Sequence, residues 1–176
     1  AMIRNCSLRK CGQDGVCAVA AKVPATVDIR VDRSIIEGAG QMNIEGTTLN
    51  LPPSDNSRAA ESLVSIEVTD STLRDAGASG PFQSEAHNIW LAPTSFHPGP
   101  FARARYDLTV KNSTLAKAYR TGIEIGNTGS EFKTTPDEGD YTVMLRGNII
   151  VDNGAFDLAI DAAHARIDAR ENWWGT

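Results

Sequence analysis

The stretch VDIRVDRSIIEG at residues 27–38 decides the fold that we predict for this chain. It begins with apolar residues at every second position, continues through a polar corner around Ser34, and ends in an apolar pair and a glycine. Alternation with period two is typical of a strand with one buried and one solvated face. A short run of Asp, Arg and Ser is typical of a tight turn. The stretch therefore predicts two short strands joined at a corner.

The same pattern recurs along the whole chain. Further copies occupy residues 64–75, 106–115, 143–154 and 165–175, and the opening residues 3–8 fit the same frame. The residues at the equivalent corner position, here called the anchors, are Cys6, Ser34, Ser71, Ser113, Asn148 and Asn172. Their spacings are 28, 37, 42, 35 and 24 residues. A constant motif at unequal spacing indicates one supersecondary unit that carries insertions of variable length.

A further short apolar strand follows most of the corner motifs. We expect these strands at residues 16–19, 42–44, 88–91, 122–125 and 157–160. Three short strands per repeat, stacked repeat on repeat, describe a coil in which each strand pairs in parallel with its equivalent in the next repeat. An antiparallel sandwich or barrel is the alternative for evenly spaced strands. The recurring polar corner favours the translational stack, because a series of hairpins does not require it.

The repeated motif, and especially Asn172-Trp173-Trp174-Gly175, resembles the right-handed parallel β-helix of the pectin lyase-like superfamily, with its asparagine ladder. The resemblance covers nearly the whole chain. It implies an all-β solenoid of about six coils, formed by residues 1–176 as a single domain. It also implies a secreted, periplasmic or cell-surface protein that acts on polysaccharide, or else a structural, adhesin or phage-type segment. Members of this superfamily include lyases, hydrolases, epimerases, esterases and tailspikes, so the resemblance is specific for the fold and weak for the activity.

Composition excludes several classes of protein. The chain has 176 residues, of which 41% are hydrophobic, as in an ordinary globular domain. Its net charge of −5 and its lack of a Lys/Arg run argue against nucleic acid as a partner. The longest uninterrupted apolar stretch, residues 16–21, is far shorter than the roughly 18 residues of a membrane span. No P-loop, nucleophile elbow or HExxH motif occurs, so we expect no cofactor.

The three cysteines, Cys6, Cys11 and Cys17, lie close together and allow at most one internal disulfide. Buried thiols and a disulfide are both compatible with this pattern. The sequence contains no Cys-x-x-Cys pair, and its three histidines are scattered, so we predict no zinc site.

Candidate site residues come from strand alternation. In relatives, the sheet of Gly-Ile-x-Ile strands forms the floor of the substrate groove, and the long connections at about 45–63, 92–105 and 126–140 would wall it here. With the aliphatic residues facing inward, we expect one outward row of Asn43, Trp90, Glu124 and Ala159. The predicted catalytic carboxylates are Glu124, Asp157 and Asp161, and the predicted substrate-binding residues are Asn88, Trp90, Tyr119 and Arg120. A Trp near a carboxylate suits sugar recognition and acid/base chemistry. The alternative is a plain solvated sheet face.

Two further expectations concern a cation and the ends of the chain. A lyase commonly uses Ca²⁺, and residues 137–140, Asp-Glu-Gly-Asp, could hold that cation. The chain enters directly on a strand and stops within its last coil, which leaves parallel edges uncovered. We therefore expect either a fragment of a longer solenoid or a homo-oligomer formed through the open ends.

Overall fold

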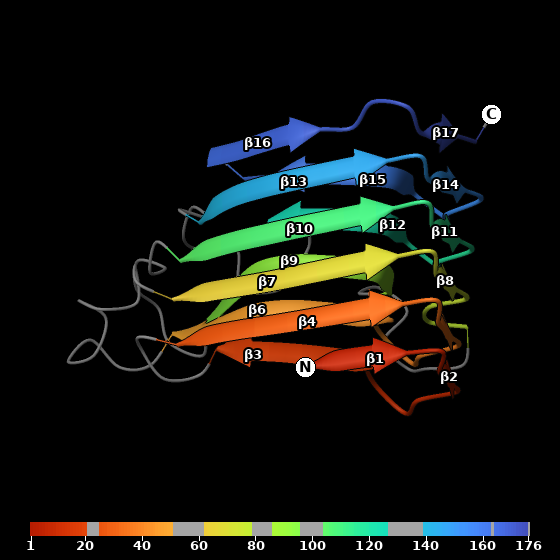
Figure 1. The fold of residues 1–176 in the computed structure, drawn as a ribbon, viewed down its shortest axis with the longest axis horizontal. Coiled ribbons are helices and arrows are strands. Elements are labelled where there is room, and N and C mark those ends of the chain that lie inside the picture. The colour runs from red at the N-terminus through yellow and green to blue at the C-terminus, as the bar shows by residue number, and fades with distance from the viewer. Residues whose placement is uncertain are drawn as a thin grey trace.

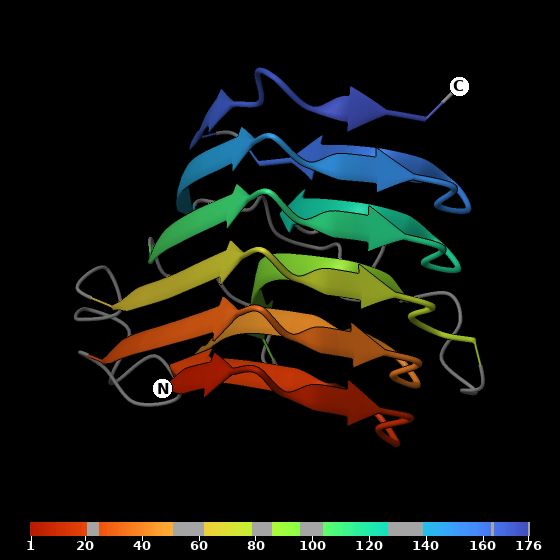
Figure 2. The same cartoon turned by 45° about the vertical axis from the view of Figure 1, so that its right-hand side comes forward.

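The computed structural model describes residues 1–20, 25–50, 62–78, 86–95, 104–126, 139–162 and 164–175. Within these residues every regular element is a β-strand, and the strands pair in parallel to form three sheets (Figure 1). Each strand pairs with its equivalents in the neighbouring repeats, so that the chain rises through a regular stack (Figure 2). The predicted all-β, solenoid-like architecture is confirmed, and it is consistent with a parallel β-helix.

The three sheets take their strands in turn from each repeat. Sheet A contains the strand before each anchor: β1 (Met2–Arg4), β4 (Thr26–Asp32), β7 (Leu63–Thr69), β10 (Arg105–Lys111), β13 (Asp140–Arg146) and β16 (His164–Asp168). Sheet B contains the short strand after it: β2 (Ser7–Arg9), β5 (Ile35–Glu37), β8 (Thr72–Arg74), β11 (Thr114–Ala116), β14 (Ile149–Val151) and β17 (Trp173–Trp174). Sheet C contains the third strand: β3 (Val16–Ala20), β6 (Ile44–Asn50), β9 (His87–Ser95), β12 (Thr121–Gly126) and β15 (Phe156–Asp161).

The core lies between the sheets and is built from the inward residue of each alternating pair. In β7 and β10, Val64, Ile66, Val68, Leu108 and Val110 are at most 1% exposed. Equivalent residues stack directly on each other because the register between repeats is unbroken. Aliphatic side chains stacked at the strand spacing form a continuous apolar column, and burial of each one stabilises the fold by about 1.5–3 kcal/mol.

Two aromatic residues occupy the same column position in neighbouring repeats. Tyr106 and Tyr141 are register partners, and their rings stack with centroids 4.7 Å apart and planes 11° apart. The Tyr106 hydroxyl lies 2.6 Å from the Thr48 hydroxyl oxygen, so its polar end has a buried partner. The pair therefore fills the core without leaving the Tyr106 hydroxyl unpaired.

The anchors form a continuous hydrogen-bonded ladder at the corner between sheets A and B, here called the corner ladder. The backbone N–H of Cys6 donates to Ser34 Oγ at 3.1 Å, and that of Ser34 donates to Ser71 Oγ at 3.0 Å. The N–H of Ser113 donates to Asn148 Oδ1, and that of Asn148 to Asn172 Oδ1, both at 3.0 Å. Each anchor side chain from Ser34 to Asn172 thus satisfies a backbone donor of the preceding repeat.

A left-handed backbone conformation precedes every anchor. The residues at this position have φ between 46° and 64°: Asn5, Arg33, Asp70, Asn112, Gly147 and Glu171. Only one of the six is glycine, so in the other five the unfavourable conformation is imposed on an L-residue. The conformation turns the chain so that the following N–H points along the stack toward the next anchor.

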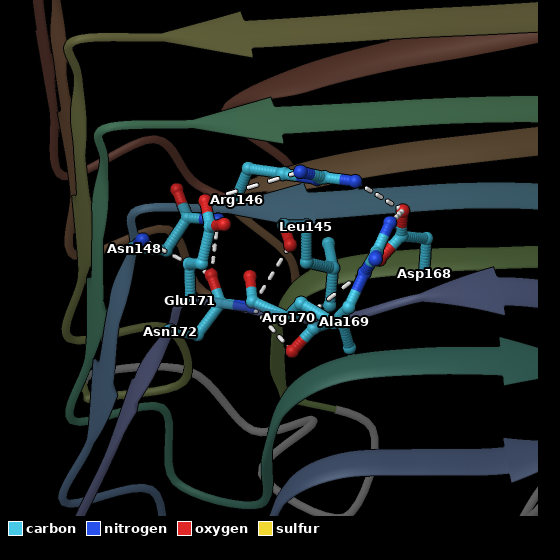
Figure 3. Close-up of polar contacts among 8 residues, drawn as sticks. All are labelled: Leu145, Arg146, Asn148, Asp168, Ala169, Arg170, Glu171 and Asn172. Carbon is cyan, nitrogen blue, oxygen red and sulfur yellow. Dashed lines mark hydrogen bonds and ion pairs between the residues drawn. The ribbon is translucent and has the colours of Figure 1, made fainter.

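The last corner shows the ladder together with its charged surroundings (Figure 3). The Asn172 amide donates to the backbone carbonyls of Leu145 at 2.9 Å and Ala169 at 2.8 Å. Beside it, Asp168 accepts from Arg146 at 2.5 Å and from Arg170 at 2.9 Å. Hydrogen bonds from these two guanidinium groups hold the pKa of Asp168 well below its ordinary value.

Two boundaries differ from the prediction. The strand expected at residues 42–44 is β6, and it runs from Ile44 to Asn50. Similarly, β9 continues to Ser95, so the first two predicted connections begin later than expected. Polar residues such as Thr47 and Thr48 are buried at the end of β6, which apolar alternation does not signal.

We predict that Asn148→Leu destabilises the fold, because it leaves the Ser113 N–H without its acceptor. The expected loss of unfolding free energy is about 1–3 kcal/mol, measured by chemical denaturation. Ser34→Asn, which keeps an acceptor oxygen, should be tolerated. The control Thr109→Val, on the outward face of β10, should stay within about 0.5 kcal/mol of the parent protein. An unchanged denaturation midpoint for Asn148→Leu would show that the ladder is not a source of stability.

Candidate functional site

The outer face of sheet C carries a row of residues in register, here called the central row. Ile123 and Ile125 of β12 are buried in the core, so that alternation turns Glu124 away from it. Register places Glu124 beside Trp90 of β9, and Trp90 beside Glu45 of β6. The complete central row is Cys17, Glu45, Trp90, Glu124 and Ala159.

The predicted row contained Asn43 instead of Glu45, and this was wrong. Because β6 begins at Ile44 and Ile44 pairs with Ile89, Asn43 lies level with Asn88. The two residues form a second ladder, in which Asn43 Nδ2 donates to Asn88 Oδ1 at 2.7 Å. The predicted position was displaced by two residues along the strand. It therefore assigned the amide of Asn43 to the central row, where the acidic Glu45 lies.

Asn88 is fully buried, contrary to the exposure that alternation predicted. Its Nδ2 donates to the Ala116 carbonyl and to Asn153 Oδ1, both at 3.1 Å. These contacts lie at the turn between sheets B and C. The amide of Asn88 is therefore engaged in the second ladder, and it does not line an open surface.

Glu124 is likewise buried, at 2% exposure, and it faces a histidine that the sequence analysis did not select. Glu124 Oε2 lies 3.3 Å from His87 Nδ1, and His87 is also 2% exposed. Burial, reinforced by the positive charge of Arg120, lowers the pKa of His87 to about 3. The imidazole is consequently neutral at ordinary pH and lies against the carboxyl group.

The other predicted residues differ in accessibility. Asp157 is half-buried and accepts a hydrogen bond from Asn153 Nδ2 at 2.7 Å. Asp161 is exposed and pairs in register with Gly126. Tyr119 is 57% exposed, whereas Arg120 is half-buried. Since Ala159 is the register partner of Glu124, the two aspartates lie on either side of Glu124 on the neighbouring strand.

One group of side chains on sheet C and the turn before it has the chemistry of metal ligands. Asp14, Cys17 and Glu45 offer ligand atoms that all lie within 4.8 Å of one another. The Cys17 thiol donates to Glu45 Oε2 at 3.1 Å, and Asp14 Oδ1 accepts from the Met42 N–H at 3.2 Å. A thiolate with two carboxylates suits a borderline divalent cation better than calcium.

Two of these groups also have raised pKa values. Burial, followed by the hydrogen bond and charge of Glu45, raises the pKa of Cys17 to about 12. Burial raises the pKa of Asp14 as well. The sequence analysis missed this group because its three members come from two repeats and follow no metal motif. The predicted calcium ligands Asp137 and Glu138 lie outside the described residues, and all three cysteines are free thiols.

We predict that Glu45→Gln makes Cys17 more reactive. Removing the carboxylate lowers the pKa of the thiol, and the thiolate is the form that reacts. The measurement is the rate of iodoacetamide alkylation at pH 8.5, in a protein with Cys6→Ser and Cys11→Ser as background. The control Glu37→Gln makes the same charge change on sheet B, where Glu37 pairs with Arg9 and Arg74, and should leave the rate unchanged. Equal rates in all three proteins would contradict the assigned contact.

We predict that His87 stays neutral down to acidic pH and makes stability fall as the pH is lowered. The unfolded chain binds a proton near pH 6.5, whereas folded His87 does so only near pH 3. The stabilising difference is therefore complete above about pH 6.5 and is lost between that value and 3. Histidine signals in NMR spectra should show no titration of His87 between pH 4.5 and 8, and His87→Gln should flatten this part of the stability curve. A His87 midpoint near 6.5 would refute the burial effect.

Comparisons with known proteins identified no matching family, no matching curated protein and no matching solved structure. Among the described residues, no helix has the length and apolar character needed to cross a membrane. The assignment of function consequently rests on the geometry of the described residues.

Proposed function

We propose that the chain is a right-handed parallel β-helix of about six coils, of the pectin lyase-like kind, and that it binds polysaccharide on the outer face of sheet C. The corner ladder that ends at Asn172 supports the first part of this proposal. The binding function follows from the chemistry of the central row. A secreted, periplasmic or surface location agrees with this function.

A single observation carries the binding proposal. The half-buried indole of Trp90 lies between two carboxyl-bearing residues, Glu45 and Glu124, on adjacent strands about 4.8 Å away on either side. An aromatic ring can stack on the apolar face of a sugar ring, and the half-buried carboxylate of Glu45 can accept hydrogen bonds from sugar hydroxyls, whereas Glu124 is buried. The proposal also assigns Tyr119 and Arg120, from the turn before β12, to this site as a second aromatic ring and a cation.

The burial of Glu124 favours binding over catalysis as the main function. Glycoside hydrolysis needs two carboxyl groups that reach the same glycosidic bond. Glu124 is 2% exposed and Asp157 accepts a hydrogen bond from Asn153, which leaves Asp161 as the exposed member of the predicted catalytic set. If the protein is catalytic, Glu124 with His87 would be its acid/base pair, since a neutral imidazole beside a carboxyl group can transfer a proton.

We also propose self-association through exposed apolar side chains. Met2 is 53% exposed and Trp173 is 64% exposed. A homo-oligomer would cover these apolar side chains. A purely structural or adhesin role would need only this association together with contacts along the sides of the stack.

We predict that Trp90→Ala weakens binding to a neutral oligosaccharide by about tenfold, because loss of one stacking contact removes roughly 1–2 kcal/mol. Calorimetry or glycan-array binding supplies the measurement. Trp173→Ala, which removes an exposed indole from sheet B, serves as the matched control and should bind like the parent protein. Glu124→Gln should abolish turnover and spare binding if the protein is an enzyme. The proposal fails if no glycan binds and Trp90→Ala behaves like the parent.

A further inference from the structure

A second candidate site lies on sheet A, away from the central row. It is a groove of about 540 Å³ at the beginning of β10, β13 and β16. Its charged and polar lining residues are Arg105, Asp140, Thr142, His164 and Arg166. Figure 1 shows these strands one above another on the side of the stack opposite sheet C. The groove is therefore separated by the core from Trp90 and Glu124.

Strand register explains why the charged side chains gather there. Arg105, Asp140 and His164 are register partners on three successive strands, and Thr142 pairs with Arg166 one step further along the outward face. Arg105, His164 and Arg166 are exposed to solvent. The groove thus offers two permanent positive charges, one histidine and one carboxylate within a few strand spacings.

The arginines of this groove are weakly neutralised compared with four other arginines on the stack. Arg9 and Arg74 both lie 2.6 Å from Glu37, and Arg146 and Arg170 both bond Asp168 (Figure 3). By contrast, the one ion pair of Arg105 with another described residue is to Asp107, at 4.0 Å. Within the described part of the chain, Arg166 forms no ion pair. On a chain of net charge −5, these two guanidinium groups form a local cationic site.

We propose that this groove binds an acidic oligosaccharide, one whose sugars carry carboxylate or sulfate groups. Guanidinium groups match the oxyanion in charge and in bidentate geometry. Asp140 would repel a simple anion, but its oxygens can accept hydrogen bonds from sugar hydroxyls, as can the Thr142 hydroxyl. A ligand that combines an oxyanion with hydroxyl groups satisfies both kinds of side chain. A polyphosphate backbone is disfavoured by the net negative charge of the protein.

The proposal extends the proposed function to a second site and a defined class of sugar, but it depends on other residues. Sugar binding at Trp90 depends on stacking, which is insensitive to charge. Binding in the groove depends on exposed charges and should weaken as salt rises, since ions screen such charges beyond about 8–10 Å at physiological ionic strength. The binding proposals for the two sites can therefore be tested independently of each other.

The test measures binding of three probes to the full chain by calorimetry: a chondroitin sulfate oligosaccharide, a neutral cello-oligosaccharide of similar length, and potassium sulfate. Arg166→Gln and Arg105→Gln should each weaken binding of the sulfated probe by about tenfold or more, which is the usual effect of losing a charged hydrogen-bond donor. Arg30→Gln is the matched control, because Arg30 is an exposed arginine of the same sheet that pairs with Asp28 and Glu67. It should bind like the parent protein.

The outcomes separate this proposal from the one for sheet C. Loss of sulfated-probe binding in Arg166→Gln and Arg105→Gln, with normal binding in Arg30→Gln, supports the groove. Equal losses in all three variants show a general charge effect and overturn it. Binding of potassium sulfate as tight as that of the oligosaccharide assigns the site to a free anion and also overturns it. Failure of Trp90→Ala to affect the neutral probe refutes the sheet C site alone. Circular dichroism of each variant checks the fold.

Discussion

The structure depends on one hydrogen bond that is repeated from Cys6 to Asn148 at the corners between sheets A and B. A left-handed residue turns the next backbone N–H along the stack, and the acceptor that it meets there is an anchor side chain from the following repeat. Such a donor would otherwise be buried without a partner, which costs about 1–3 kcal/mol. Because each anchor meets its neighbour directly, the ladder aligns the strands on both sides of the corner. A slip of one residue would break the ladder and turn the core side chains of sheet A to solvent.

This constraint acts only at the corner, so the rest of each repeat can vary. The residues joined by the ladder are 28, 37, 42, 35 and 24 positions apart, yet the strands around them keep equal lengths within sheets A and B, apart from the strands at the two ends. Outward positions then stack in rows, and within each row the charged side chains lie close enough to interact. In the row that contains Glu37, its carboxylate forms ion pairs with Arg9 and Arg74. In the row that contains Cys17 and Glu45, partial burial raises the pKa values of Cys17 and of the neighbouring Asp14, and the charge of Glu45 adds to the rise for Cys17.

Local patterns in the sequence were sufficient to predict the strands and the ladder. Ser34 and Asn148 could be recognised because polar corner residues recur in the same frame as the alternating strands. Burial of outward residues could not be predicted in the same way. Alternation states which side of a strand Glu124 occupies, but whether other residues cover that side depends on contacts between distant segments. His87 was missed for the same reason, because the sequence around a single histidine at a strand start does not show that it lies beside Glu124. The error at Asn43 arose because a ladder residue and a strand residue look alike at the start of β6.

The stacked rows also explain why this fold suits recognition of chain-like ligands. Within a row, equivalent groups repeat in steps of about 4.8 Å along the stack, and along a strand the outward positions repeat about every 6.6 Å. The side chains at these positions point outward from a flat sheet, so that they can contact an extended ligand but do not surround a small one. Convergence, which catalysis requires, arises where the chain changes direction. Two groupings of that kind lie at strand starts: His87 begins β9 and faces Glu124, and Arg105, Asp140 and His164 begin their strands beside the groove. We accordingly propose binding at the middle of sheet C, with Trp90, and chemistry or charge selectivity at the strand starts.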